Sequence, residues 1–123
     1  MAARPPRIWS MWLYDGAEQW LAIQVGSPAW FQWLAAPTTT SFSYPVYNQA
    51  RGYIDGFMTV RKEGRRRGGS YWRVYRRTHG QLGQIYLGPA RQVTHGRLVA
   101  VVRTFLAAHY DCPEAEIPIT RHH

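Results

Sequence analysis

Arginine and tyrosine are concentrated in one part of this sequence, and both residue types can bind anionic ligands. The chain carries fifteen Lys and Arg against seven Asp and Glu, for a formal net charge of +8. Fourteen of these fifteen cations are Arg, and eight of the fifteen lie between Arg61 and Arg77. This balance favours an anionic partner such as nucleic acid, and the planar fork of Arg fits phosphates and guanine edges. A GC-rich genome is the alternative explanation, because it would also favour Arg over Lys.

Three segments around this region have the composition of β-strands. Residues 57–63, 70–77 and 81–87 are rich in β-branched and aromatic residues and are separated by turns that contain glycine, so they predict an antiparallel meander. Side chains alternate between the two faces of a strand, which gives the predicted sheet an apolar face and a basic, aromatic face. The residues expected beneath a helix are Met58, Val60, Trp72, Val74, Ile85 and Leu87. Those expected to face outward are Thr59, Arg61, Tyr71, Arg73, Tyr75, Arg77, Gln84 and Tyr86.

The outward face is the candidate binding site. Arg can hold phosphates or guanine, Tyr can hydrogen-bond a phosphate or stack on an unpaired base, and Gln can contact adenine. Three further arginines lie in the turn before the second strand, at the tip of the predicted hairpin. The candidate nucleic-acid-binding residues are Arg61, Arg65, Arg66, Arg67, Tyr71, Arg73, Tyr75, Arg77, Gln84 and Tyr86. The alternative is a solvated basic face on which the tyrosines serve cross-strand packing.

Short motifs in and around this segment follow one another in a fixed order. They are Arg61-Lys62-Glu63, Arg67-Gly68-Gly69, Tyr71-Trp72-Arg73-Val74-Tyr75-Arg76, Tyr86-Leu87-Gly88-Pro89 and Thr94 with Arg97-Leu98. With Pro28-Ala29-Trp30-Phe31-Gln32-Trp33-Leu34 and Ser41-Phe42-Ser43-Tyr44 upstream, the pattern resembles the N-terminal segment of bacterial MalT-like, LuxR-family transcriptional regulators. The resemblance spans about residues 28–98 and implies a role in transcription control. Nothing in this sequence matches the ATPase and helix-turn-helix regions of those regulators, and Gly83 and Gln84 stand where the family pattern tends to be basic.

The predicted order of three strands and a helix is also similar to that of two DNA-binding domains. These are the plant APETALA-type domain and the arm-binding domain of tyrosine recombinases. Both resemblances imply a sheet laid in the major groove, with Arg61, Arg73 and Arg77 as base readers or phosphate clamps. They make duplex DNA the expected partner in preference to RNA, while single-stranded RNA or DNA remains the alternative because tyrosines can stack on unpaired bases.

The elements that flank the predicted sheet have local start and stop signals. The runs 8–14 and 19–25 surround Asp15-Gly16, which predicts a β-hairpin. Ser27-Pro28 predicts the start of a short helix over about 28–36, and residues 44–56, which contain proline and glycine, are expected to be a connecting loop. Thr94 is expected to cap a helix over about 95–109. The apolar stripe of that helix consists of Leu98, Val101, Val102, Phe105 and Leu106.

Together these signals predict one α+β domain spanning residues 1–123. It comprises an N-terminal β-hairpin and short helix, then a three-stranded antiparallel sheet packed on a C-terminal helix. Within it, 8–43 form a Trp-rich hairpin and helix subregion, 57–109 the basic sheet with its helix, and 110–123 an irregular tail.

Catalysis has little support in the sequence. The five His residues show no H-x-E or C-x-x-C spacing, and Gly64 to Gly69 lack the Gly-Lys-Ser/Thr of a phosphate loop. Cys112, the only cysteine, could pair with His109, but a lone Cys near a helix end is more often inert. We therefore expect a protein that is not an enzyme and has neither cofactor nor metal.

The remaining expectations concern other partners and location. Five tryptophans fall in the first third of the chain, namely Trp9, Trp12, Trp20, Trp30 and Trp33. They are expected to fill a core, or alternatively to form a patch for a protein partner or a second copy. No stretch reaches the roughly 20 apolar residues of a membrane helix, and no signal peptide is recognisable. The sequence thus predicts a cytoplasmic protein without a membrane partner.

Overall fold

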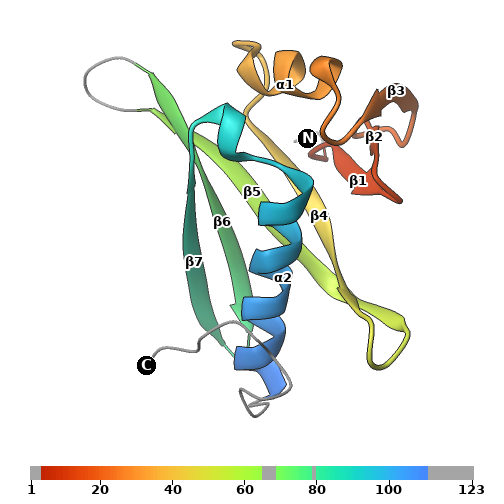
Figure 1. The fold of residues 1–123 in the computed structure, drawn as a ribbon, viewed down its shortest axis with the longest axis vertical. Coiled ribbons are helices and arrows are strands. Elements are labelled where there is room, and N and C mark those ends of the chain that lie inside the picture. Colours follow the sequence, from red (N-terminus) through yellow and green to blue (C-terminus); the bar gives the residue numbers. More distant parts are fainter. Residues whose placement is uncertain (1–3, 65–68, 79, 111–123) are drawn as a thin grey trace.

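A computed structural model of the protein describes residues 4–64, 69–78 and 80–110 (Figure 1). Seven strands form one sheet in the order β3-β2-β1-β4-β5-β6-β7. The strands are β1 (Arg7–Trp9), β2 (Trp12–Tyr14), β3 (Trp20–Gln24), β4 (Ser41–Asn48), β5 (Tyr53–Gly64), β6 (Ser70–Thr78) and β7 (Gln81–Gly88). The helices are α1 (Pro28–Ala35), the 3-10 turn η1 (Ala90–Gln92) and α2 (His95–Tyr110).

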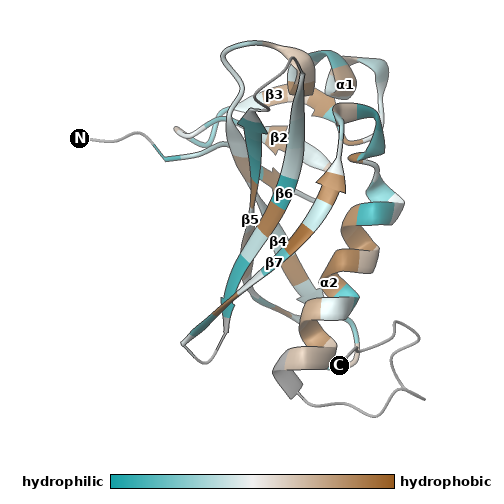
Figure 2. Ribbon diagram, turned by 90° about the vertical axis from the view of Figure 1, so that its left-hand side faces the viewer, coloured by the Kyte–Doolittle hydropathy of each residue, from teal (hydrophilic) through white to brown (hydrophobic). Residues whose placement is uncertain are grey.

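The sheet is mixed, because β1 pairs in parallel with β4 while the other neighbouring strands are antiparallel. Both helices pack on the same side of it, and the opposite side carries no helix (Figure 2). A helix on one face only leaves the other face of an antiparallel sheet to solvent or to a ligand. We call this uncovered side the open face.

Large aromatic rings build the centre of the core between the sheet and the helices. Trp30 of α1 has no exposed surface, and its Nε1 donates to the carbonyl oxygen of Val93 at 3.0 Å. The Phe42 ring lies between Trp30 and Trp72, at centroid distances of 5.1 and 5.6 Å. These contacts tie α1 to both β4 and β6, so one continuous core supports the whole sheet.

The predicted division of the sheet into two faces is confirmed for β5, β6 and β7. Five of the six residues expected beneath a helix are buried, and Ile85 is partly buried against them. The helix stripe is also confirmed, with Leu106 partly buried and the other members buried. The five buried sheet residues are Met58, Val60, Trp72, Val74 and Leu87.

Both helices start where the sequence predicts. The Ser27 Oγ accepts from the backbone N–H of Trp30 at 3.2 Å, and Pro28 occupies the first turn of α1. The Thr94 Oγ1 accepts from the backbone N–H of Arg97 at 3.2 Å. Each cap satisfies an N–H that has no partner within its own helix.

The prediction of a three-stranded sheet is wrong, because the sheet has seven strands. The expected connecting loop over 44–56 is wrong as well, since β4 covers Ser41–Asn48 and pairs with both β5 and β1. Pro45 made this strand hard to predict, because proline has no N–H to donate to the hydrogen-bond ladder of a sheet. The strand accommodates Pro45 by a shift of register between Pro45 and Tyr47.

The run 8–14, expected as one strand, is itself a hairpin of β1 and β2. It turns at Ser10 and Met11, whose φ angles are 49° and 72°. Positive φ at both central residues is typical of a type I′ turn, which normally contains Asn or Gly. The second hairpin, over Asp15-Gly16, joins β2 to β3 as predicted, and the Asp15 Oδ1 accepts from the backbone of Ala17 and Gln19.

Candidate nucleic-acid interface

The open face brings the central candidate residues of three strands together. Strand register places Arg61 of β5 opposite Arg73 of β6, and Arg73 opposite Tyr86 of β7. The six residues of the open face that contact one another here are called the Arg–Tyr cluster. They are Arg61, Glu63, Tyr71, Arg73, Tyr75 and Tyr86.

Guanidinium groups and phenol rings are stacked in this cluster. The Arg73 Cζ lies 5.5 Å from the Tyr71 ring centroid and 5.8 Å from that of Tyr86. The Arg61 Cζ lies 5.6 Å from the Tyr75 centroid. The rings of Tyr71 and Tyr86 are 5.4 Å apart and inclined by 40°. Stacking on a ring restrains a long Arg side chain, so less conformational freedom is lost when a ligand binds.

Glu63 also belongs to the cluster, although it was not among the site residues predicted from the sequence. The Tyr75 hydroxyl donates to Glu63 Oε2, and the Arg73 Nε lies 3.4 Å from Glu63 Oε1. Its position in the 57–63 strand, two residues after Arg61, was the signal that could have placed it on this face. Glu63 reduces the repulsion between Arg61 and Arg73, which face each other across neighbouring strands.

These contacts shift the pKa values of three side chains in the cluster, Glu63, Arg73 and Tyr75. The hydrogen bond from Tyr75 is the main cause that lowers the pKa of Glu63, with smaller contributions from Tyr71 and Arg73. The same hydrogen bond raises the pKa of Tyr75. The pKa of Arg73 is raised chiefly by Tyr71 and then by Glu63. At neutral pH the cluster therefore holds a carboxylate, a neutral phenol at Tyr75 and a charged guanidinium.

The Glu63→Gln variant should make folding stability less dependent on pH in the acid range. Because folding lowers the pKa of Glu63, its contribution is fully present above the unfolded-state pKa of about 4.3 and is lost as pH falls through the lower folded-state pKa. The fall in Tm between pH 7 and pH 3 should be smaller in Glu63→Gln than in the wild type. Thermal unfolding followed by circular dichroism measures it, and an equal or larger fall in the variant would contradict the contacts described.

Two further candidates lie on the open face beside the cluster. Gln84 is exposed and sits opposite Tyr75, while Arg77 is exposed and its Nη1 donates to the carbonyl oxygen of Gly80 at 3.3 Å. Arg65, Arg66 and Arg67 lie outside the described residues. The structure thus places seven of the ten candidates on one face of β5, β6 and β7.

The open face continues across β4 to β1, where no sequence signal indicated a binding surface. The Arg7 Cζ lies 4.8 Å from the ring centroid of Phe57, and Phe57 is 38% exposed. Trp9, next to them on β1, is 44% exposed. These residues were missed because their position depends on β4 and β1 joining the sheet.

Some of the five tryptophans lie in the core and others are exposed, so each of the two interpretations, core and surface patch, holds for part of the set. Trp30 is in the core, and Trp33 is partly buried and stacked on it at 5.5 Å. Trp9 and Trp20 are exposed by 44% and 58%, and Trp20 makes an edge contact of 5.4 Å with Trp12. One exposed aromatic patch therefore lies at the β1–β3 end of the sheet.

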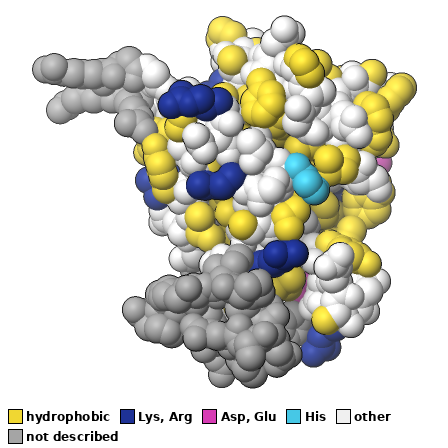
Figure 3. Space-filling view, viewed as in Figure 1, with side chains coloured by type: hydrophobic (Ala, Val, Ile, Leu, Met, Phe, Trp, Pro, Cys, Tyr) yellow, Lys and Arg dark blue, Asp and Glu magenta, His cyan; other side chains and the backbone are white. Residues whose placement is uncertain are grey.

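The helix-covered side has a different character. Figure 3 shows Lys and Arg side chains that lie apart from one another among apolar ones on that side. Lys62 is turned toward it, where its Nζ donates to the carbonyl oxygen of Ala36 at 2.9 Å and lies 5.6 Å from the Trp72 ring centroid. Lys62 thus stabilises the end of α1 and does not belong to the open face.

Other kinds of site find no support in the part of the chain that the structure describes. Within residues 4–64, 69–78 and 80–110, no three His, Cys, Asp or Glu side chains gather in a way that could hold a metal ion. No helix in those ranges is long and apolar enough to cross a membrane. Cys112 and His79 lie outside the described residues.

Comparison of the chain with protein-family models, with curated proteins and with solved structures finds no match. The resemblance to the N-terminal segment of MalT-like regulators therefore stays a prediction. The case for a function rests on the geometry and chemistry of the open face.

Proposed function

We propose that the protein binds single-stranded nucleic acid on the open face of its sheet and acts without catalysis. The observation that carries this proposal is the Arg–Tyr cluster, in which two guanidinium groups are stacked on tyrosine rings on a side that no helix covers. Cations and exposed rings in one place match the two parts of a nucleic acid strand, its phosphates and its bases.

Phosphate binding would depend on the arginines. Arg61 and Arg77 are exposed and Arg73 is partly exposed, so their N–H groups can reach a strand laid across β5 to β7. Bonds from guanidinium to phosphate are charge-assisted and stronger than neutral ones. Glu63 orients Arg73 through the 3.4 Å contact between Arg73 Nε and Glu63 Oε1. Its negative charge also disfavours any position of the nucleic acid that would place a phosphate directly over the carboxylate.

Base stacking would depend on the aromatic residues. Tyr86 and Phe57 are 45% and 38% exposed on the same face, at its β7 and β4–β5 regions. Exposed rings gain about 1–3 kcal/mol per stacked base when bases are unpaired, whereas in a duplex the base faces are already occupied. The rings therefore favour a single strand.

The breadth of the open face also favours a single strand over the major groove. Residues of the open face lie on five neighbouring strands, β1 and β4 to β7, which are spaced about 4.8 Å apart. A major groove is about 12 Å wide and admits a helix or a two-stranded ribbon. The expectation that the protein inserts into the major groove of DNA depended on a three-stranded sheet. The sheet has seven strands, so this expectation no longer has that basis.

Binding should be salt-dependent and selective for single strands. Each phosphate contact to a single strand contributes a slope of about −0.7 in log K against log salt. Two contacts would lower the affinity about sevenfold between 50 and 200 mM KCl. Fluorescence anisotropy with labelled fifteen-nucleotide dT and rU strands, and with a duplex of equal length, measures these quantities. Equal affinity for the duplex, or no binding at 50 mM KCl, would contradict the proposal.

A protein-docking role is a second candidate, and the exposure of Trp9 and Trp20 favours it. Tryptophans are enriched at interface centres, where burial of their rings supplies much of the binding energy. Such docking depends on apolar burial and is insensitive to moderate salt, so the same salt series distinguishes it from binding through arginines. Both roles can coexist, because the tryptophans lie at the β1–β3 end and the Arg–Tyr cluster lies on β5 to β7.

A further inference from the structure

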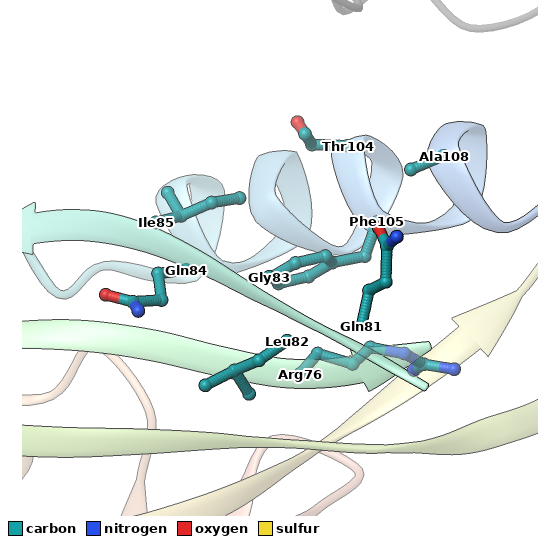
Figure 4. A pocket seen from close by; sticks show the side chains of 9 residues that line it. All are labelled: Arg76, Gln81, Leu82, Gly83, Gln84, Ile85, Thr104, Phe105 and Ala108. Atoms are coloured by element: carbon teal, nitrogen blue, oxygen red, sulfur yellow. The ribbon is translucent and has the colours of Figure 1, made fainter. Parts of the chain in front are cut away.

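A cavity of about 350 Å³ lies on the side of the sheet opposite the Arg–Tyr cluster, between the β6–β7 hairpin and the C-terminal half of α2 (Figure 4). At one wall β7 approaches α2 closely, because Gly83 has no side chain and a Cβ there would stand 2.8 Å from the Cε1 of Phe105. The lining residues are Arg76, Gln81, Leu82, Gly83, Gln84, Ile85, Thr104, Phe105 and Ala108.

Arg76 is the charged residue of this lining, and much of its guanidinium has no partner. Its Nη2 donates to the carbonyl oxygen of Asp55 at 2.8 Å. Its Nε and Nη1 atoms are buried and make no hydrogen bond, and no ion pair joins Arg76 to a carboxylate among the described residues. A buried charge without a counter-ion destabilises a folded chain, and unsatisfied buried donors in native proteins usually have an explanation in a ligand, an ion or water.

The fold places Arg76 there by strand alternation. Trp72 and Val74 of β6 are buried on the helix side, and Arg76 continues that series two residues later. The hydrogen bond to Asp55 holds the guanidinium beside the N-terminal end of β5. Figure 4 shows the Arg76 side chain near Gln81 at one end of the lining, with the Phe105 ring nearer Gly83.

The rest of the cavity is largely apolar. Phe105, Ile85 and Ala108 contribute hydrocarbon surface, while the Thr104 hydroxyl is already used as a donor to the carbonyl oxygen of Ala100. A guanidinium at one end and an apolar wall along the other fit a molecule with an anionic head and a short hydrocarbon body. The volume is at the lower end of the range for pockets that bind small molecules.

We propose that this cavity binds a small organic carboxylate, with its head group on Arg76 and its hydrocarbon part against Phe105, Ile85 and Ala108. The carboxylate would form a charge-assisted pair with the guanidinium of Arg76, and the Arg76 side chain has to turn toward the cavity to form it, because its Nε and Nη1 are buried. The proposal is independent of nucleic-acid binding, because Arg76 and the Arg–Tyr cluster lie on opposite sides of β6.

The experiment is a titration of the isotope-labelled full chain with hexanoate, monitored by NMR, with chloride and inorganic phosphate as comparison anions. The proposal predicts saturable shifts at the Arg76 Nε–H, at residues 81–85 and at residues 104–108. Phosphate, which lacks a hydrocarbon body, should bind at least tenfold more weakly. Shifts that instead concentrate on Arg61 and Arg73, or shifts of equal size with all three anions, would overturn the proposal.

Three variants separate a binding role of Arg76 from a structural one. Arg76→Gln should raise the Kd for hexanoate at least tenfold, whereas the matched neighbour variant Arg77→Gln should leave it within twofold. Arg76→Met removes the uncompensated charge and leaves a shorter, unbranched apolar side chain, so it should raise Tm without hexanoate and abolish the hexanoate-induced rise in Tm. A lower Tm in Arg76→Met together with unchanged hexanoate binding in Arg76→Gln would show that Arg76 is only structural.

The Ala108→Leu variant tests the cavity itself without touching the charge. Ala108 is exposed on α2 and lines the cavity, so a larger side chain there can fill the space while the core is left intact. Hexanoate affinity should fall at least fivefold in a chain whose Tm is close to that of the wild type. Undiminished affinity would place the carboxylate elsewhere.

Discussion

Replacing Trp72 by alanine should lower the free energy of unfolding by about 3–5 kcal/mol. Trp72 is 1% exposed in the middle of β6 and lies 5.6 Å from Phe42, through which it connects β6 to α1. Its removal leaves a cavity that the neighbouring strands can fill only in part, and it also takes away the ring against which Lys62 lies. A loss of this size is a large fraction of the 5–15 kcal/mol that typically stabilises a domain.

Urea denaturation of the variant and the wild type measures this loss. The matched control is Trp20→Ala, because Trp20 is 58% exposed and surface substitutions usually change stability by no more than about 0.5 kcal/mol. If both variants lost the same stability, or if Trp72→Ala were as stable as the wild type, the assignment of the two faces of the sheet would be wrong.

Replacing Arg73 by alanine should weaken the binding of a dT strand roughly tenfold to hundredfold, which is the range for loss of one hydrogen bond to a charged group. Arg73 is at the centre of the Arg–Tyr cluster, where it contacts Tyr71, Tyr86 and Glu63. The change also leaves the Glu63 carboxylate without its ion-pair partner, and the uncompensated negative charge then repels phosphate. Because one phosphate contact disappears, the salt slope should become shallower by about 0.7.

Two variants control for this interpretation. Tyr86→Ala should weaken binding about fivefold to hundredfold through lost stacking while the salt slope stays unchanged, since no charge is removed. Arg103→Ala removes one charge from the exposed side of α2 and should leave the affinity within about twofold. Should Arg103→Ala weaken binding as much as Arg73→Ala, overall charge and not the Arg–Tyr cluster would explain the affinity.

Local signals were enough to predict the central part of the fold. The strands β5, β6 and β7 alternate apolar and polar residues between glycine-containing turns, and the two helices begin at Ser27 and Thr94, which cap them. Alternation and capping depend only on neighbouring residues, so they can be read without knowledge of the tertiary structure. For the same reason seven candidates of the site were correctly placed on one face.

The rest of the sheet depends on contacts that are distant in sequence. Strand β4 contains Pro45, and the parallel pairing of Arg7 with Ser43 joins residues far apart along the chain. The turn at Ser10 and Met11 lacks the Gly or Asn that would have marked it. With β4 and β1 missing from the prediction, the contribution of Phe57 and Trp9 to the open face could not be foreseen.

The most direct test of nucleic-acid binding on the open face is NMR mapping of the contact surface with a short dT strand. Chemical shifts should change at Arg61, Tyr71, Arg73, Tyr75 and Tyr86, and they should change little at the core residues Val74, Leu98 and Phe105. The signals of the first group should return to their free positions as salt is raised. Shifts confined to α2 and the helix-covered side, or no shifts at low salt, would contradict binding on the open face.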